Sequence, residues 1–180
     1  MITLLKNPAT AKVDPVTTPP PLSWLNPGNC FTSNNVYANS SPTISGDQTI
    51  LDTEVYLQTG DGILIGDNKA DTSTAWVTAD SYITYGDESD KWNATLTPAI
   101  VNAIDFGVGV ACKVSTSESA RVYASNFAFN IPTSAVIRGI KVEVEKRKIY
   151  NFRFNLTNAN IDHIRTVSYT HLTLPTNREV

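Results

Sequence analysis

The sequence predicts an all-β protein: an antiparallel β-sandwich of jelly-roll-like topology with one short helical turn. Two observations lead to this prediction. From Trp24 onward, short alternations of apolar and polar residues are separated by clusters of Gly, Asn, Asp and Ser, a pattern typical of short strands joined by turns. One segment, which begins at Thr97-Pro98, has the signals of a helix start.

The length and composition favour one globular domain with terminal extensions. The chain has 180 residues, 41% of them hydrophobic, and a formal net charge of -3, which suits a single core. We expect three parts: a Pro- and Thr-rich N-terminal arm over residues 1–23, the sandwich over 24–165, and a tail over 166–180. Pro19-Pro20-Pro21 favours an extended, polyproline-like connection within the arm.

Individual strands are predicted by residues that alternate between core and solvent. The clearest covers Val136 to Lys146. The same two-residue period recurs near Val55 and Leu57 and in three further segments. Thr59-Gly60-Asp61-Gly62 predicts a hairpin turn, because a tight reversal needs residues that tolerate positive φ. In the clearest strand, Ile140, Val142 and Val144 face one way and Lys141, Glu143 and Glu145 the other; the further alternations are Phe106 to Cys112, Phe127 to Ile131 and Ile161 to Arg165.

The helical turn is predicted from its first residues. Thr97 can cap it, and Pro98 suits the first helical position. We expect one or two turns that pack Ile100 and Ile104 towards the core.

Composition argues against several classes of partner. A slightly acidic chain offers no basic face for nucleic acid. No apolar run approaches the length of a membrane span, and Lys6 and Pro8 interrupt the N-terminal apolar stretch, so we expect synthesis in a cytosol. Cys112 continues an inward alternation and is interpreted as a buried thiol; a disulfide with Cys30 stays open, because two cysteines without a spacing motif do not decide it.

The last residues resemble a translated sequencing-library adapter. Val-Ser-Tyr-Thr-His-Leu-Thr-Leu-Pro-Thr, residues 167–176, is one reading frame of the transposon-end adapter used in such libraries. The resemblance implies that the genuine sequence ends at Arg165 and that 166–180 is an artefact, to be left out of functional reasoning.

The chain lacks the motifs of the common enzyme classes, so we expect no enzymatic activity, no cofactor and no metal site. Without the tail, His163 is the one remaining histidine, too few for a catalytic base together with a multi-histidine metal site. No nucleophile elbow, phosphate-binding glycine loop or zinc-protease helix motif is present. Two acidic loop clusters leave calcium binding or glycosidase chemistry as minor alternatives to simple solvation: Asp61, Asp67 and Asp71, and Asp87, Glu88 and Asp90.

Aromatic residues gather in the same region of the sequence as the second acidic cluster. Exposed rings beside carboxylates suit sugar binding, whereas buried rings would simply close the end of the sandwich. The candidate carbohydrate-binding residues are Trp76, Tyr82, Tyr85, Asp87, Asp90 and Trp92.

Many short segments between Trp24 and Arg165 together resemble a β-sandwich module of bacteriophage virion proteins, of the minor structural, tail or fibre-associated kind. Each segment is weakly specific alone, and most of the chain is covered. The matching segments are Trp24–Asn29, Asn35–Ala38, Asp52–Leu57, Ile65–Ala70, Trp76–Thr78, Tyr82–Gly86, Asp90–Trp92, Leu96–Ala99, Asn102, Phe106–Val108, Ser125–Arg147 and Ile161–Arg165.

The resemblance implies a non-enzymatic structural protein of the virion, assembled in the bacterial cytoplasm. Its partners would be other virion proteins and further copies of itself; the alternative is a carbohydrate-binding adhesion module that recognises a glycan on the host surface. The order of segments departs from the family, because Ser125–Arg147 follows, rather than precedes, the segments around Glu54 and Trp76. A natural permutation and a misassembled read both explain this departure.

Overall fold

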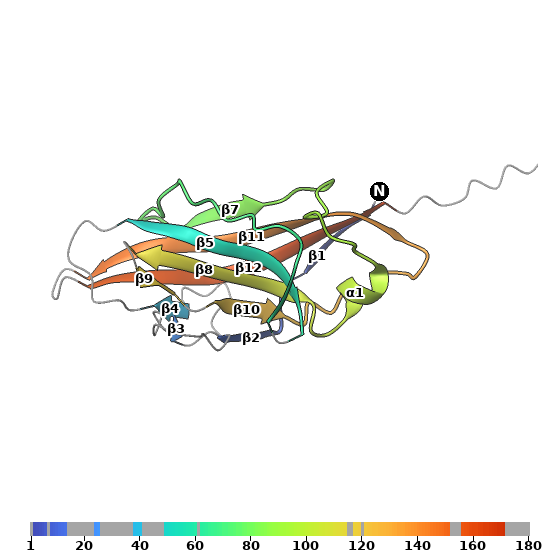
Figure 1. Cartoon of the computed structure of the whole chain (residues 1–180), viewed down its shortest axis with the longest axis horizontal. Helices are drawn as coiled ribbons and strands as arrows, with labels where there is room; N and C mark the ends of the chain where they lie inside the picture. Colours follow the sequence, from blue (N-terminus) through green and yellow to red (C-terminus); the bar gives the residue numbers. More distant parts are fainter. Residues whose placement is uncertain are drawn as a thin grey trace, which may run out of the picture.

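The computed structural model describes residues 2–6, 8–13, 24–25, 38–40, 49–60, 62–114, 117–119, 121–151 and 156–171. Within these ranges the protein is mostly β-strand with one short helix, and all strand pairs are antiparallel. The prediction of an antiparallel, mainly β protein with one helical turn is therefore confirmed at this level. Figure 1 shows the longest strands running along the long axis, with the helix at one end.

The first sheet, sheet A, is built around the two longest strands. Its order is β3-β4-β12-β11-β7, and β1 also pairs with β12. The register places Val144 opposite Ile83 on one side and Ile164 on the other. The strands are β1 (Ile2–Lys6), β3 (Trp24–Leu25), β4 (Ala38–Ser40), β7 (Ser81–Tyr85), β11 (Val136–Asn151) and β12 (Leu156–His171).

The second sheet, sheet B, has the order β2-β10-β8-β5-β6, with β9 also paired to β8. Its central strands contain several valines, which suit a pleated, buried surface. The strands are β2 (Thr10–Val13), β5 (Ile50–Thr59), β6 (Ile63–Ile65), β8 (Gly107–Val114), β9 (Ser117–Glu118) and β10 (Val122–Ser125).

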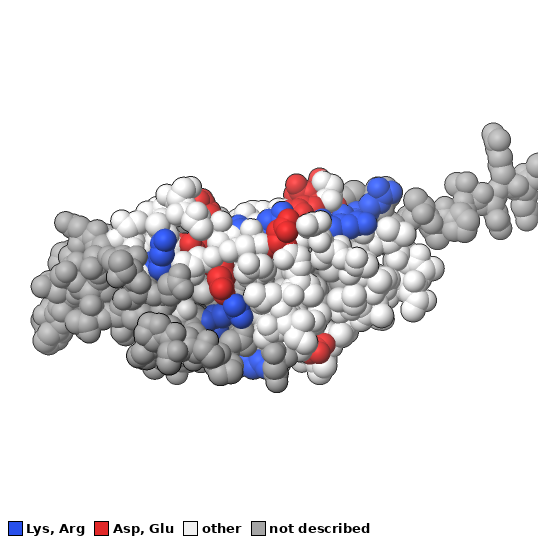
Figure 2. Space-filling model, viewed as in Figure 1, with Lys and Arg blue, Asp and Glu red and all other residues white. Residues whose placement is uncertain are grey.

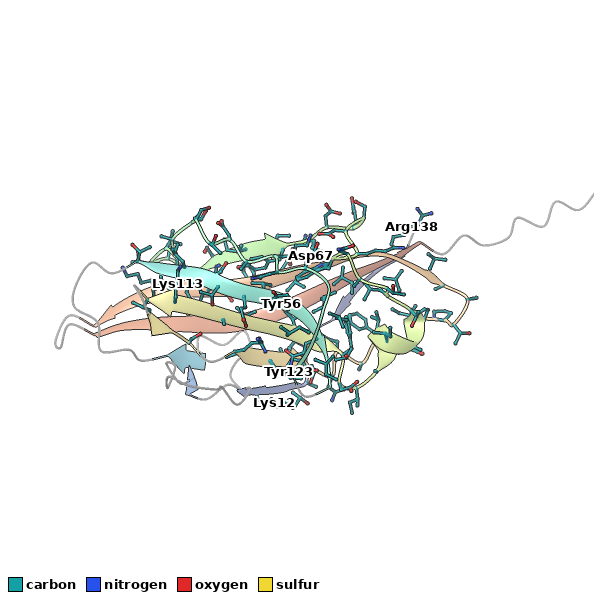
Figure 3. All side chains as sticks on the ribbon, in the orientation of Figure 1. Lys12, Tyr56, Asp67, Lys113, Tyr123 and Arg138 are labelled. Carbon is teal, nitrogen blue, oxygen red and sulfur yellow. The ribbon has the colours of Figure 1, made fainter. Side chains whose placement is uncertain are left out.

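The N-terminal segment contributes strands to both sheets. Residues 2–6 pair with the C-terminal half of β12, and residues 10–13 pair with β10. Lys12 lies beside Tyr123 across this second pairing, with Nζ 5.4 Å from the ring centroid (Figure 3). The segment expected to be an arm thus includes two sheet strands, while Pro19-Pro20-Pro21 lies outside the described residues. Residues 166–171, assigned above to an adapter-derived tail, continue β12.

The two sheets supply one hydrophobic core. As the alternation predicted, Val55 and Leu57 are buried from sheet B, and Ile140, Val142 and Val144 from sheet A. Burying such side chains contributes about 1.5–3 kcal/mol each relative to exposure.

The β5–β6 hairpin forms where the sequence predicted it. Thr59 pairs with Ile63 across the turn. Gly60 and Gly62 have φ of 57° and 84°, a conformation that costs glycine little. Asp61, between them, lies outside the described residues.

The helix α1 (Pro98–Asn102) confirms the predicted cap but not all of the predicted packing. The Thr97 side chain accepts a hydrogen bond from Ile100 N at 3.3 Å, and Val101 and Ile100 pack at the core. Ile104 is 73% exposed, so the expectation that it packs inwards is wrong. The reason is that Ala103 is already extended, with ψ of 142°, so helical periodicity does not reach Ile104.

The predicted alternation of Phe127, Phe129 and Ile131 is buried but is not a strand. Asn126 and Ala128 have φ of 58° and 50°, a left-handed conformation that cannot continue a ladder. The two phenylalanine rings stack with centroids 5.8 Å apart. The segment therefore closes the core as an irregular connection between β10 and β11.

No helix in the described ranges has the length and apolar character that a membrane crossing needs.

Candidate functional site

The structure separates the aromatic residues that the sequence had grouped as a sugar-binding face. Trp76, Tyr85 and Trp92 are buried, and Trp92 is fully so. Tyr82 is 48% exposed, and its hydroxyl donates a hydrogen bond to Glu145 Oε2 at 3.0 Å. The four rings do not share an exposed face on which a pyranose would stack.

The two carboxylates of the same group serve their own loop. Asp87 Oδ1 accepts hydrogen bonds from the backbone and hydroxyl of Ser89 at 2.7 and 2.8 Å, which lower the pKa of Asp87. Asp90 Oδ1 accepts from Trp92 N at 2.7 Å, and Oδ2 pairs with Lys69 Nζ at 2.9 Å. The contacts to Ser89 and Trp92 are those of loop capping, and the ion pair connects the loop to Lys69.

Trp92 anchors this loop to sheet A. Its Nε1 donates to Ile140 O at 2.7 Å, and Ile140 N donates to Asp90 O at 2.9 Å. Trp92 has a φ of 59°, and Gly86 and Gly66 lie so close to it that a Cβ at either position would clash. Bulky residues are uncommon at positive φ, so tertiary packing holds Trp92 in place.

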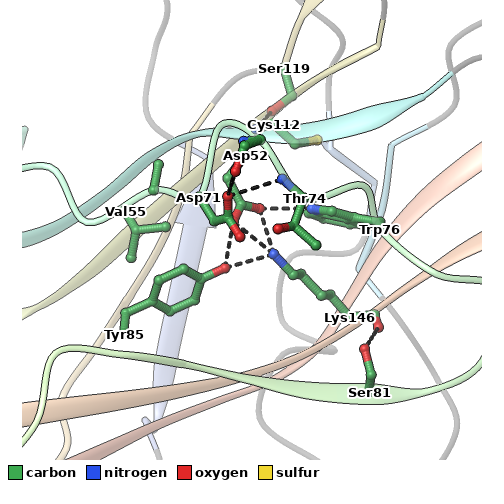
Figure 4. Close-up of polar contacts among 12 residues, drawn as sticks. Asp52, Val55, Asp71, Thr74, Trp76, Ser81, Tyr85, Cys112, Ser119 and Lys146 are labelled. Atoms are coloured by element: carbon green, nitrogen blue, oxygen red, sulfur yellow. Dashed lines mark hydrogen bonds and ion pairs between the residues drawn. The ribbon is translucent and has the colours of Figure 1, made fainter.

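The strongest concentration of polar chemistry lies inside the protein, between the two sheets. Asp52 of β5 and Lys146 of β11 form an ion pair in which Lys146 Nζ lies 2.7 Å from both Oδ1 and Oδ2 (Figure 4). Their side chains are 0% and 5% exposed. A pair this deep is sustained only when the remaining polar atoms are also satisfied.

Trp76 and Tyr85 complete that requirement. Trp76 Nε1 donates to Asp52 Oδ1 at 2.7 Å, and Tyr85 OH donates to Oδ2 at 2.6 Å. Lys146 Nζ also donates to Tyr85 OH at 2.7 Å, so all three ammonium protons have acceptors. Nζ further lies 5.0 and 5.4 Å from the Trp76 and Tyr85 ring centroids, within cation–π range. We call these four residues the inter-sheet cluster.

Burial shifts the acid–base behaviour of the cluster. Desolvation lowers the pKa of Lys146, although the negative charge of Asp52 opposes that change. Desolvation and the Asp52 charge both raise the pKa of Tyr85. The phenol therefore stays protonated and remains a donor to Asp52.

Cys112 lies on β8 within the buried core, as the sequence predicted. It is a free thiol, and burial raises its pKa to about 12. The Cys112 backbone N donates to Ser119 Oγ at 2.9 Å. Cys30 lies outside the described residues.

A small pocket reaches the inter-sheet cluster from the surface. Its volume is about 80 Å³, and its lining includes the exposed Thr74 and Val77 as well as the buried Trp76 and Lys146. Asp71 also lines it. Hydrogen bonds from Thr74 and Ser73 hold the pKa of Asp71 below its usual range, so this carboxylate is ionised.

Across the part of the chain that the structure describes, no group of three or more His, Cys, Asp or Glu side chains is placed to hold a metal ion.

The inter-sheet cluster is the feature that sequence reasoning missed. For Lys146 a signal existed, because the inward alternation Ile140, Val142, Val144 continues to it. For Asp52, the alternation wrongly indicates a side chain that faces away from the core. Counting back from Leu57 and Val55 puts Thr53 inside, but a register shift between Asp52 and Glu54 turns Asp52 inwards instead.

No known protein family, curated protein or solved structure matches the chain significantly.

Proposed function

We propose that this chain is a non-enzymatic structural protein of a bacteriophage virion, a tail, fibre or particle-surface component that acts through protein–protein contacts. We infer also that its two sheets pack as a jelly-roll-like β-sandwich. The proposal rests on the resemblance of the segments between Trp24 and Arg165 to virion modules and on the burial of the inter-sheet cluster.

The structural observation is the position of the polar chemistry. Asp52 and Lys146 come from different sheets, are buried, and have their hydrogen bonds met within the protein. Breaking such an arrangement is costly, so it supports a role in holding the sheets together. This favours a scaffold over the sugar-binding alternative, for which Trp76, Tyr85 and Trp92 would have to present their faces to solvent.

Sheet edges are the surfaces through which a scaffold of this kind would make contact. The β6 strand lies at an edge of sheet B in the described structure and is only three residues long. Its first residue, Ile63, is 61% exposed. On the face shown in Figure 2, charged residues of both signs are scattered among uncharged ones.

The virion role is tested by looking for the protein in particles. Particles are purified on a density gradient from a lysate of a host that carries the gene, and digested for mass spectrometry. We expect peptides of this chain to co-purify with the major capsid and tail proteins at a constant ratio across the gradient. Peptides that stay in the soluble fraction would overturn the proposal.

Self-association is tested separately by light scattering over a range of concentrations. We expect a multimer whose mass falls in the I63D variant, because a charge on the β6 edge disfavours strand pairing. The matched control is I104D, which places the same charge at an exposed isoleucine outside the sheets. A monomer at every concentration would contradict a role in self-assembly.

A further inference from the structure

Lys146 is a primary amine held against a carboxyl group in a buried site. Its Nζ is 2.7 Å from each oxygen of Asp52. Equal distances place Nζ on the plane that bisects the carboxyl group, and the carbon Cγ lies on that plane too. With ordinary carboxylate bond lengths, these two contacts put Nζ no more than about 3 Å from Cγ, which meets the distance of about 3–3.5 Å required of reacting atoms in a near-attack arrangement; effective molarities of about 10⁵–10⁸ M are known for such arrangements.

We propose that Lys146 and Asp52 condense to form an intramolecular isopeptide bond that links β11 to β5 and so joins the two sheets covalently. The Nζ–Cγ bond forms and one Cγ–O bond breaks. The departing oxygen carries away two of the three ammonium hydrogens as water. Ammonium plus carboxylate becomes neutral amide plus water, with no change in oxidation state and no co-reactant.

Tyr85 provides the proton route that this step needs. The nucleophile must be the neutral amine, and the leaving oxygen must be protonated. Tyr85 OH accepts a hydrogen bond from Lys146 Nζ and donates one to Asp52 Oδ2. When Tyr85 gives its proton to Oδ2 and takes one from Nζ, both conditions are met without a free ion. Burial lowers the pKa of Lys146 and so favours the neutral amine.

The Trp76 hydrogen bond determines which Asp52 oxygen stays in the amide and which one leaves. Trp76 Nε1 donates to Oδ1, which keeps this oxygen as the future amide carbonyl and stabilises the negative charge that develops on it during attack, as an oxyanion-hole donor does. Oδ2, which receives the proton from Tyr85, is the oxygen that leaves. After the reaction, the amide N–H can donate to Tyr85 OH, and the amide carbonyl Oδ1 still accepts from Trp76 Nε1.

The surroundings favour the product and give the water a way out. Two buried charges are replaced by a neutral amide, which removes the desolvation penalty of the ion pair. The pocket of about 80 Å³ at Lys146 has exposed residues in its lining and is roomy enough for a water molecule. The Lys141–Glu143 pair serves as a comparison that is not expected to condense. Its contact is equally short, at 2.6 Å, but both side chains are about a quarter exposed to solvent.

The experiment is an intact-mass measurement of the full chain, purified in folded form and then denatured. We expect its mass to be lower than that of its sequence by one water molecule. Digestion should give one branched peptide that joins the segments around Asp52 and Lys146, with no tryptic cleavage at Lys146. Folded protein of full sequence mass would overturn the proposal.

Variants locate the bond. K146M and D52A should have full mass, whereas K141M, which removes the lysine of the solvated pair, should keep the deficit of one water. A deficit that persists in K146M would overturn the proposal, as would a deficit mapped to Asp61-Gly62, where an ordinary cyclic imide also loses water. Because K146M and D52A can also reduce folding, Y85F provides a further readout.

Y85F keeps both reacting groups but lacks the hydroxyl that bridges them. We expect freshly purified Y85F to contain a mixture of full-mass and dehydrated chains, with the dehydrated fraction rising over hours, while the wild type is already complete. If Y85F is already as fully dehydrated as the wild type at the earliest time point, the proton route assigned to Tyr85 is wrong.

Discussion

Asp52 and Lys146 are 94 residues apart in the sequence, yet Lys146 Nζ lies 2.7 Å from both carboxylate oxygens of Asp52 and joins sheet A to sheet B. Removing either partner leaves the other without its counter-charge. The whole inter-sheet cluster is therefore sensitive to a single substitution.

The variant D52A should strongly destabilise the protein. It leaves the Lys146 ammonium buried, takes an acceptor from Trp76 and Tyr85 and removes the carboxyl group that the proposed isopeptide bond needs. The buried, unpaired charge alone should lower the free energy of unfolding by about 3–5 kcal/mol, and the loss of the cross-link adds to this. Urea denaturation followed by tryptophan fluorescence measures this. E143A is the control: it removes the acid of the partly exposed Lys141–Glu143 pair and should cost at most about 1 kcal/mol. Equal losses in the two variants would contradict this account of the cluster.

The variant W92F should reveal how firmly the loop is held to β11. Phenylalanine fills most of the same volume but cannot donate to Ile140 O. The unsatisfied buried carbonyl should cost about 1–3 kcal/mol, measured as the shift of the urea transition. Y82F, which removes a hydroxyl at an exposed position, should stay within about 0.5 kcal/mol of the wild type. A neutral W92F would mean that the hydrogen bond contributes nothing to the anchoring.

Local patterns in the sequence were sufficient to predict the strand-rich class and several of its parts. The alternation around Val142 and Val55, the cap at Thr97 and the glycines of the hairpin all depend on neighbours in sequence. The predictions that Ile104 packs inwards and that Phe127 to Ile131 form a strand were wrong, because the backbone conformation changes within one or two residues at each place.

The inter-sheet cluster could not be predicted because it depends on events far apart in the chain. A one-residue register shift next to Asp52 decides which face of β5 its side chain occupies. The Tyr85 and Trp76 donors then meet it from other segments. An aromatic residue near carboxylates in sequence looks the same whether it binds sugar at the surface or donates to a buried acid, and only tertiary packing separates the two.

The variant G139A should loosen the contact between β11 and the loop over residues 87–90. A Cβ on Gly139 would lie 2.5 Å from Asp87 O and 2.7 Å from Asp90 N. These are backbone atoms that cannot rotate away, so we expect a loss of about 1–3 kcal/mol in unfolding free energy. The control is G109A on β8, where the nearest atoms belong to the Arg121 and Gln58 side chains, so that side-chain rotation can relieve part of the overlap. The thermal unfolding midpoint of G139A should be lower than that of G109A, and the reverse order would contradict this explanation.

Cys112 should be unreactive in the folded protein. The C30S variant is used so that Cys112 is the one thiol in the chain. Burial raises the Cys112 pKa to about 12, so at pH 8 almost no thiolate exists, and the thiolate is the reactive form. Ellman's reagent should therefore label native C30S at a rate limited by unfolding, and at the rate of an ordinary thiol once urea has unfolded the chain. D52A, which lowers stability, should raise the native rate in proportion to its unfolded population. Rapid labelling of native C30S, independent of stability, would show that Cys112 is open to solvent.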